Sequence, residues 1–350
     1  MDIKDLLKIT ADKNASDLLL TVGVKPALRI DGKLFSIEDF PILTSNDTEE
    51  LTNSLMTPEQ KQMLTRKKEM DFSFPFEAMR FRINVFIQRG SFGAALRLVP
   101  MVIPSPAELG LPPIVDRFIN ATQGLVVVTG PSGHGKSTSI ASFIQEINKT
   151  RSEHIITIED PIEYAYTNEK SIIEQREVFS DTHSFANGLR SVLRQDPNVV
   201  MVGEMRDLET IEAALITAET GHLVFTTLHT NDASQATERI INIFPPHQQF
   251  QVRLQLANVM LGIMAQRLLP RLGGGRSLAT EILLASPAVR NLIREGKTYQ
   301  LPNAIQTGAE EGMISLNKSL AELVQKGEVT LDEAEKWSPD PRDMKRMIYL

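Results

Sequence analysis

The sequence predicts an α/β protein with two domains, the second built on a mostly parallel sheet. From residue 116 onward, apolar strand-like runs alternate with helix-like segments, which favours parallel strands with helices on both faces. Before residue 99, short strands with alternating apolar residues indicate a smaller α/β domain. Between these parts, residues 99–113 contain five prolines, which lack backbone donors and favour an extended linker.

These patterns set the expected boundaries. We expect a first domain at residues 1–99, a proline-rich linker at 100–113, and a second domain at 114–338 whose C-terminal part is helical. The last residues, 339–350, are polar and contain proline, so we expect a loose tail there.

The composition is that of an ordinary globular protein, with 42% hydrophobic and 23% charged residues. No apolar run approaches the roughly 20 residues of a membrane helix and the N-terminus lacks a signal-peptide core, so we expect a cytoplasmic protein without direct membrane insertion. The absence of cysteine excludes disulfides and thiolate zinc sites. The net charge of −7 gives no electrostatic reason to expect a nucleic-acid partner.

Turn and cap signals place the first elements of the first domain. Residues 27–35 hold Asp31 and Gly32 between two apolar alternations, which predicts a β-hairpin. Thr57, Pro58 and Gln60 predict the start of a helix with a capping box.

Arginine recurs on one face of the predicted first-domain sheet. A strand expected at residues 80–87 carries Arg80 and Arg82 opposite its apolar face, and a strand at 94–99 carries Arg97. Such a face is either solvated, or some of its arginines face a nucleotide held by a neighbouring subunit. The residues alone leave both interpretations open.

Strand and helix signals alternate along the second domain. Strands are expected at residues 125–128, 154–158, 199–202, 222–227 and 278–284. Asp207 predicts the cap, and Gly221 the stop, of one helix. The other helices are expected at residues 138–148, 182–194, 233–243, 248–268 and 288–295, with more to about residue 337.

The first of these strands runs into a Walker A pattern, GPSGHGKST. Glycines let the backbone curl so that its N–H groups point at phosphate oxygens, and the following helix presents its positive end to the same anion. Lys136 is expected at the β- and γ-phosphates, with the Ser137 hydroxyl on Mg²⁺. The sequence therefore predicts a site for ATP or GTP made of Gly130, Pro131, Ser132, Gly133, His134, Gly135, Lys136, Ser137 and Thr138.

Polar side chains follow three further strands, and the carboxyl ends of parallel strands meet at one edge of the sheet. Glu204 is suited to orient and deprotonate the attacking water, with a helix cap or ion pair as its structural alternative. Glu163 lies in an acidic cluster that could hold Mg²⁺ through water, act as the base, or be a solvated turn. His229 is placed to donate a hydrogen bond to the γ-phosphate. The sequence does not decide which glutamate is the base.

Two other histidines, His134 and His222, can be explained without a catalytic role. His134 occupies a position of the Walker pattern that accepts any residue, so its side chain is expected to point outward. The alternative is that it contacts phosphates or a neighbouring subunit and adds pH sensitivity. His222 begins the predicted strand at residues 222–227 and His229 follows it, and a structural role fits His222. No third ligand lies at a spacing that suits zinc.

Five motifs together resemble the type II/IV secretion superfamily of ATPases, and within it the ATPases of type IV pilus retraction. They are the phosphate loop, ITIEDPIEY at 156–164, VGEMRDLET at 202–210, GHLVFTTLHTND at 221–232 and AVRNLIRE at 288–295. The resemblance spans about residues 1–335. It implies a PAS-like first domain, a RecA-like ATPase domain and a homohexameric ring.

The resemblance also implies roles for single residues and partners. Glu163 matches the acidic-box glutamate, Glu204 the Walker B glutamate and His229 the histidine box, while Arg82 and Arg97 match arginines that approach the nucleotide. The motor would act on an inner-membrane pilus platform protein at the pilus base, with residues 288–295 tuning the coupling. A nucleic-acid translocase, an ATP-gated scaffold and an accessory pilus ATPase are the alternatives.

Overall fold

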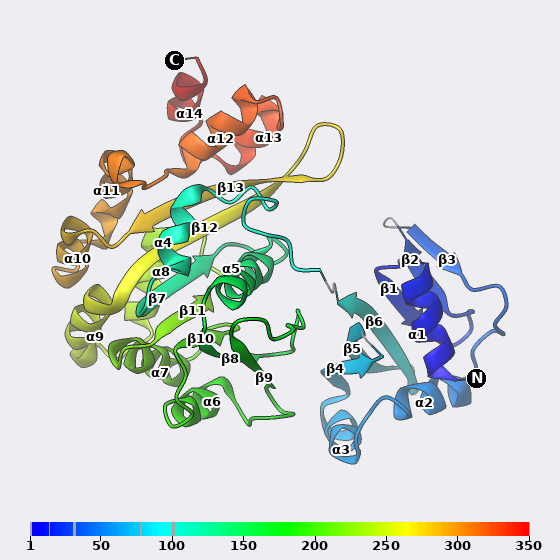
Figure 1. Cartoon of the computed structure of the whole chain (residues 1–350). Helices are drawn as coiled ribbons and strands as arrows, with labels where there is room; N and C mark the ends of the chain where they lie inside the picture. The colour runs from blue at the N-terminus through cyan, green and yellow to red at the C-terminus, as the bar shows by residue number, and fades with distance from the viewer. Residues whose placement is uncertain (1, 14, 31–32, 78, 100–101, 350) are drawn as a thin grey trace. The chain divides into compact units, whose positions relative to one another are not determined.

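A computed structural model describes residues 2–13, 15–30, 33–77, 79–99 and 102–349 (Figure 1). Its contacts divide the chain into two compact units. Unit 1 comprises Met1–Val102 together with Asp160–Ala165, and unit 2 comprises Ile103–Glu159 and Tyr166–Leu350. The division falls inside the proline-rich segment. That a short piece of the later chain belongs with unit 1 is not foreseen by the sequence patterns.

Unit 1 is a six-stranded antiparallel sheet with three helices. The strand order is β3-β2-β1-β6-β5-β4. The strands are β1 Asp17–Leu20, β2 Ala27–Ile30, β3 Lys33–Ser36, β4 Glu69–Phe76, β5 Met79–Gln88 and β6 Ser91–Val99. The helices are α1 Ile3–Asp12, α2 Ser45–Asn53 and α3 Pro58–Lys67.

Local signals in unit 1 act as expected. The Thr57 side chain accepts from Gln60 N and the Gln60 side chain accepts from Thr57 N, so the predicted capping box at the start of α3 is confirmed. On β5, Phe81, Ile83 and Val85 are fully buried in the core of the unit. The hairpin turn expected at Asp31 and Gly32 lies outside the described residues.

Unit 2 contains a seven-stranded sheet in the order β13-β12-β7-β11-β10-β8-β9. Its neighbours are all parallel except β13, which runs antiparallel to β12, so the mostly parallel sheet is confirmed. The strands are β7 Gly124–Thr129, β8 His154–Glu159, β9 Ile172–Glu177, β10 Val199–Val202, β11 Leu223–Thr227, β12 Met260–Pro270 and β13 Arg276–Leu284.

Helices pack around this sheet and continue to the end of the chain (Figure 1). Those flanking the sheet are α4 Asp116–Ile119, α5 Lys136–Thr150, α6 Phe185–Val192, α7 Leu208–Glu219, α8 Ala233–Asn242 and α9 Pro246–Val259. Those that follow β13 are α10 Pro287–Arg294, α11 Leu301–Thr307, α12 Leu316–Gln325, α13 Leu331–Trp337 and α14 Pro341–Ile348. Short 3₁₀ turns occupy Pro113–Val115, Thr298–Gln300 and Ala309–Glu311.

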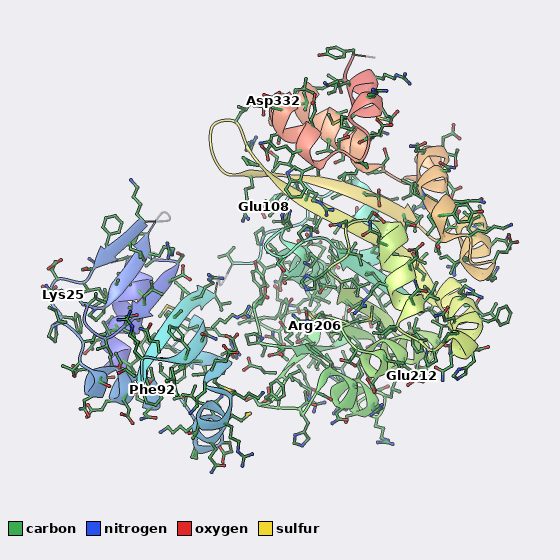
Figure 2. The ribbon with its side chains drawn as sticks, turned by 180° about the vertical axis from the view of Figure 1, so that it is seen from behind. Lys25, Phe92, Glu108, Arg206, Glu212 and Asp332 are labelled. Carbon is green, nitrogen blue, oxygen red and sulfur yellow. The ribbon has the colours of Figure 1, made fainter. Side chains whose placement is uncertain are left out.

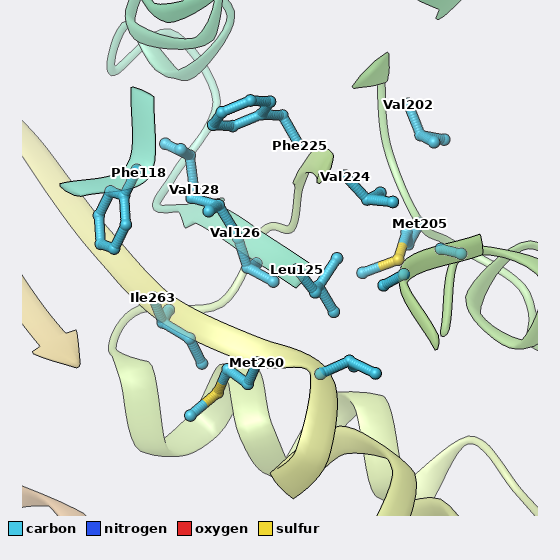
Figure 3. Packing of buried hydrophobic residues seen from close by; sticks show 14 of the residues in the cluster. Phe118, Leu125, Val126, Val128, Val202, Met205, Val224, Phe225, Met260 and Ile263 are labelled. Atoms are coloured by element: carbon cyan, nitrogen blue, oxygen red, sulfur yellow. The ribbon is translucent and has the colours of Figure 1, made fainter. Parts of the chain in front are cut away.

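The main core lies along the middle strands. Every residue of β7, β10 and β11 is buried, as expected of parallel strands covered on both faces. In Figure 3, Val126 and Val128 of β7 lie between Phe225 of β11 and Ile263 of β12. This packing makes the sheet a rigid support for the loops at the carboxyl ends of its strands.

The helix predicted at residues 248–268 is wrong in its second half. Helix α9 ends at Val259, and Met260 opens β12, which pairs in parallel with β7. A continuous apolar run does not distinguish a buried strand from a buried helix. Within β12, Gly262 lets the strand pack closely on Phe118, because a Cβ there would lie 2.6 Å from a ring carbon of Phe118. Strand β9 also has no counterpart among the predicted elements.

The loose tail predicted at residues 339–350 is also wrong. Asp340 caps α14, Pro341 occupies its first turn, and the side chain of Met344 is fully buried. Asn317 of α12 donates to the carbonyl oxygen of Asp340, at 3.1 Å. Met347 and Ile348 pack against the same small core as Met344, so apolar residues spaced along a polar helix hold it in place. The overall polarity of the segment does not reveal this spacing.

Candidate nucleotide site

The Walker segment forms a tight loop between β7 and α5. Gly130, Gly133 and Gly135 have φ angles of 143°, 79° and 79°, a region that favours glycine. A Cβ on Gly130 would lie 2.5 Å from the carbonyl oxygen of Gln266, so a larger residue would displace β12. The loop ends where α5, a 15-residue helix, begins at Lys136.

Lys136 directs its ammonium group back into this loop. The side chain is buried, and Nζ donates to the carbonyl oxygens of Gly130 at 2.8 Å and Pro131 at 3.0 Å. A buried ammonium beside the positive end of a helix favours an anionic ligand. Ser137 follows in the first turn of α5, where its hydroxyl is a suitable ligand for a hard divalent cation bound with phosphates. The loop therefore fits a nucleotide with its metal ion.

His229 connects this lysine to Glu204. Its Nδ1 lies 3.4 Å from Lys136 Nζ, and its Nε2 lies 3.4 Å from Glu204 Oε2. An imidazole with its proton on Nε2 satisfies both contacts, because Nδ1 then accepts and Nε2 donates. Ser132 of the phosphate loop reaches the same Nδ1 at 3.5 Å. Polar groups that follow β7, β10 and β11 thus meet at one edge of the sheet.

Glu204 has a second partner in the segment that leads into α7. Arg206, labelled in Figure 2, places Nε 2.6 Å from Glu204 Oε1. The Glu204 side chain is 17% exposed, whereas that of Arg206 is 73% exposed, so only the carboxylate of this ion pair is shielded from solvent. The ion-pair alternative for Glu204 is therefore present in this conformation, together with its contact to His229.

Threonine hydroxyls hold the three loops in register. Thr129 at the end of β7 donates to the Thr230 carbonyl oxygen at 2.8 Å and accepts from Thr230 N at 3.0 Å. Thr227 at the end of β11 donates to the Gly203 carbonyl oxygen at 2.6 Å. These bonds link the segments that carry Lys136, Glu204 and His229, so the three side chains share one framework.

Glu163, Arg82 and Arg97 all belong to unit 1. Glu163 falls within Asp160–Ala165, and its Oε1 lies 3.7 Å from Nη1 of Arg82. Arg97 pairs with Asp17 at 2.9 Å but keeps 69% of its side chain exposed. Glu159, the neighbour of this acidic segment, is buried and accepts from Thr157 at 2.6 Å, which is a structural use of its carboxylate.

The other two histidines have structural partners. His222 lies just before β11, and its Nδ1 is 2.9 Å from the carbonyl oxygen of Thr217. The expectation that the His134 side chain points outward is wrong: it points at β12, where its Nδ1 accepts from Leu268 N at 3.0 Å. Burial lowers the pKa of His134, and the nearby positive charges of Arg267, Lys136 and Arg276 lower it further.

Sequence patterns miss the residues that surround His134. Gln266 and Arg267 lie on β12, which the sequence places in a helix, and Trp337 lies on α13, far along the chain. Only a correct strand assignment beside β7 would have brought Gln266 and Arg267 to the phosphate loop. Within the part of the chain that is described, no group of three or more side chains of metal-ligating type comes together, and no helix is long and apolar enough to span a membrane.

Comparisons with known proteins identify the family of the chain. The family model described as type II/IV secretion system protein matches residues 70–274. The type IV pilus retraction ATPase PilT of Pseudomonas aeruginosa is 42% identical over 98% of this chain and 100% of its own. The type IV pilus ATPase PilU of the same organism is 38% identical over 100% of this chain and 92% of its own. A crystal structure of the pilus retraction motor PilT with bound ADP superposes with a TM-score of 0.91 at 50% identity, covering 99% of this chain and 100% of that one.

Proposed function

The chain belongs to the type II/IV secretion system protein family, and on this premise we propose that it is an ATP-hydrolysing motor that powers type IV pilus retraction and twitching motility. The observation that carries the proposal is the contact series Lys136–His229–Glu204 at the edge of the parallel sheet. Similarity to PilT along its whole length supports the choice of pilus retraction.

The phosphate loop binds the triphosphate. Lys136 Nζ exchanges the carbonyl oxygens of Gly130 and Pro131 for phosphate oxygens, and the first N–H groups of α5 face the same anion. The Ser137 hydroxyl would hold Mg²⁺, with Glu163 as a ligand through water. When bound, the ion offsets negative charge on the β- and γ-phosphates.

Glu204 and His229 act at the γ-phosphate. Glu204 orients the attacking water and accepts its proton, and His229 donates from Nε2 to the phosphate oxygens as charge develops. Glu163 is the other candidate for the base. Arg82 and Arg97 lie on unit 1, and from there they would offset phosphate charge in their own or a neighbouring subunit.

The proposed assembly is a homohexamer. We infer that the ring lies in the cytoplasm against the inner membrane at the pilus base, where nucleotide-driven domain motion acts on a platform protein. The α10 helix is the candidate surface that tunes this coupling. Its Val289 and Ile293 are buried against the sheet domain, while Asn291 and Arg294 face outward.

Two substitutions test the chemistry. Lys136→Ala should abolish nucleotide binding and turnover, because the only ammonium in the loop is lost. Glu204→Gln should keep ADP binding but reduce phosphate release at least about 10²-fold, in the range expected for a lost general base. Retained hydrolysis in both variants would contradict the assignments, and stimulation of the wild-type ATPase by DNA would point to a translocase.

The second candidate function is an accessory pilus ATPase, which the similarity to PilU favours. Deleting the gene in its own organism separates the two. Cells that become hyperpiliated and immobile indicate a retraction motor. Cells that keep retracting, but with reduced force, indicate an accessory ATPase.

A further inference from the structure

Trp337, at the end of α13, contacts two side chains from distant parts of unit 2. The His134 ring of the phosphate loop approaches edge-on, with centroids 5.2 Å apart and planes at 70°. The Arg267 guanidinium of β12 lies over the indole, with Cζ 5.6 Å from its centroid. Both arrangements are attractive for an aromatic ring. Figure 2 marks α13 through its label at Asp332.

His134 ties the phosphate loop to β12. Besides the bond from Leu268 N to its ring, its carbonyl oxygen accepts from Gln266 Nε2 at 2.6 Å. Arg276 of β13 adds a longer contact of 3.3 Å to the carbonyl oxygen of Gly133. The outer side of the loop is therefore attached to the β12–β13 hairpin, and the ring of His134 extends this attachment to α13.

Arg267 ties the loop after β11 to the same place. Its Nη2 donates to the carbonyl oxygen of Asn231 at 2.7 Å, and its Nη1 donates to the carbonyl oxygen of Gln266 at 2.9 Å. Asn231 is two residues after His229. The guanidinium that packs on Trp337 thus holds the segment that positions His229 against Lys136 and Glu204.

The helix carrying Trp337 is part of a separate small core. Leu316, Leu320 and Val329 from the C-terminal helices and loops pack with Leu269 of β12 and Ala279 of β13. An ion pair between Lys345 and Glu335 joins α14 to α13 at 2.5 Å. Because these helices form a packed group, displacement of the group moves the indole with it.

We propose that Trp337 is a positioning residue that, through His134 and Arg267, holds the phosphate loop and the His229 loop in one arrangement, so that the C-terminal helices α12–α14 set the geometry of hydrolysis. Without the indole, the phosphate loop and the His229 loop keep their bonds to β12, but the His134 ring and the Arg267 guanidinium lose the side chain that both of them contact. Nucleotide binding depends mostly on the phosphate loop alone, whereas water attack needs both loops. The effect is therefore expected in kcat more than in KM.

The test compares the full-length protein with Trp337→Ala, Trp337→Phe and Val329→Ala. Val329 is buried in the same C-terminal core, and the ring contacts with His134 and Arg267 belong to Trp337, so truncation of Val329 serves as the matched control for loss of stability. We expect Trp337→Ala to lower kcat for phosphate release about tenfold or more with KM changed less than about threefold. We expect Trp337→Phe to recover most of the activity and Val329→Ala to lower Tm while kcat stays near wild type.

The inference rests on the proposed ATPase function, and amide hydrogen exchange separates the two. In Trp337→Ala, exchange should rise at residues 130–135 and also at 228–232, whether or not the protein hydrolyses ATP. Unchanged exchange at either loop, or equal losses of kcat in Trp337→Ala and Val329→Ala, would overturn the positioning role. A wild-type protein without ATPase activity, but with increased exchange at both loops in the variant, would overturn the proposed function and retain the inference.

Discussion

His229 occupies the position between the phosphate-binding lysine and Glu204, with 3.4 Å to each. One ring that accepts on Nδ1 and donates on Nε2 can keep a lysine and a carboxylate apart while fixing both. His229 follows strand β11, and a second histidine, His222, lies just before the same strand. His222 contacts the backbone carbonyl oxygen of Thr217 instead. The two histidines thus form a natural pair for comparison.

Substituting His229 by alanine should lower kcat roughly 10²-fold, because Lys136 and Glu204 lose the group between them. His222→Ala should leave kcat within about twofold and cost only modest stability. Steady-state phosphate release measures both variants. Equal losses in the two would show that the contact series has no special part in turnover.

Glu281 of β13 is a carboxyl group that lies almost wholly inside the protein. Burial raises its pKa to about 7, while the hydrogen bond from Ala233 N lowers it, the Asp232 carboxylate raises it and the Arg267 guanidinium lowers it. The bond from Ala233 N to Oε1 is 2.9 Å long. A carboxyl group near neutrality therefore lies at the start of α8, beside the arginine that holds the His229 loop.

This shift predicts a pH-dependent stability. Because the folded-state pKa is above the unfolded value, the folded state binds the proton more tightly, and this contribution is lost as pH rises from about 4.5 through 7. Glu281→Gln keeps the acceptor without the charge, so relative to wild type it should gain up to roughly 3 kcal/mol between pH 5 and pH 8.

Denaturant titrations of wild type and Glu281→Gln at the two pH values measure the gain. The comparison isolates Glu281 because His134 titrates in both proteins. A stability difference that is independent of pH would contradict the raised pKa.

At the scale of single elements, α10 is attached to the end of α9 through Arg290. Its guanidinium donates to the carbonyl oxygens of Ala257, Asn258 at 2.7 Å and Met260 at 2.9 Å, and to that of Ala285 at 3.0 Å. Most of these carbonyls close a helix whose last acceptors have no partner within the helix. One arginine therefore fixes the junction between α9 and β12.

Arg290→Ala should destabilise the protein by about 2 kcal/mol, because it leaves several carbonyl oxygens with weaker partners. Arg294→Ala on the same helix removes one contact of 3.2 Å to the Asn258 side chain and should cost less than about 0.5 kcal/mol. Urea unfolding followed by circular dichroism compares the two. Similar costs would indicate that the Arg290 bonds contribute little.

The strands that could be predicted from the sequence differ from the one that could not in the residues that bound them along the chain. Strands β7, β10 and β11 are apolar runs bounded by glycine or polar residues, so their positions and the meeting of Lys136, Glu204 and His229 follow from parallel topology. Strand β12 continues directly from α9 without a turn residue, and its apolar run fits either structure. Gln266 and Arg267, which surround His134, lie on β12, so their place beside the phosphate loop could not be predicted from the sequence.

At the scale of the whole molecule, each unit has its own buried core. Unit 1 encloses residues such as Leu6, Leu18 and Leu96, none of which belongs to the core clusters of unit 2. Independent cores usually mean that each part can fold alone. Arg82 and Arg97 lie in unit 1, whereas the phosphate loop lies in unit 2.

A fragment of residues 1–99 should therefore unfold cooperatively on heating, and a fragment of residues 103–350 should bind ADP. Phosphate release by the longer fragment should fall at least about 10²-fold, because the arginines proposed to offset transition-state charge are absent. Calorimetry and a phosphate assay measure these outcomes. Full turnover by the longer fragment would exclude Arg82 and Arg97 from catalysis.

The indole that packs against His134 and Arg267 is the only tryptophan in the chain. Selective excitation of the indole would therefore report from this one location. A change in its emission on adding nucleotide would give a label-free optical signal of events in the phosphate loop. The protein therefore carries an intrinsic fluorophore in contact with the phosphate loop.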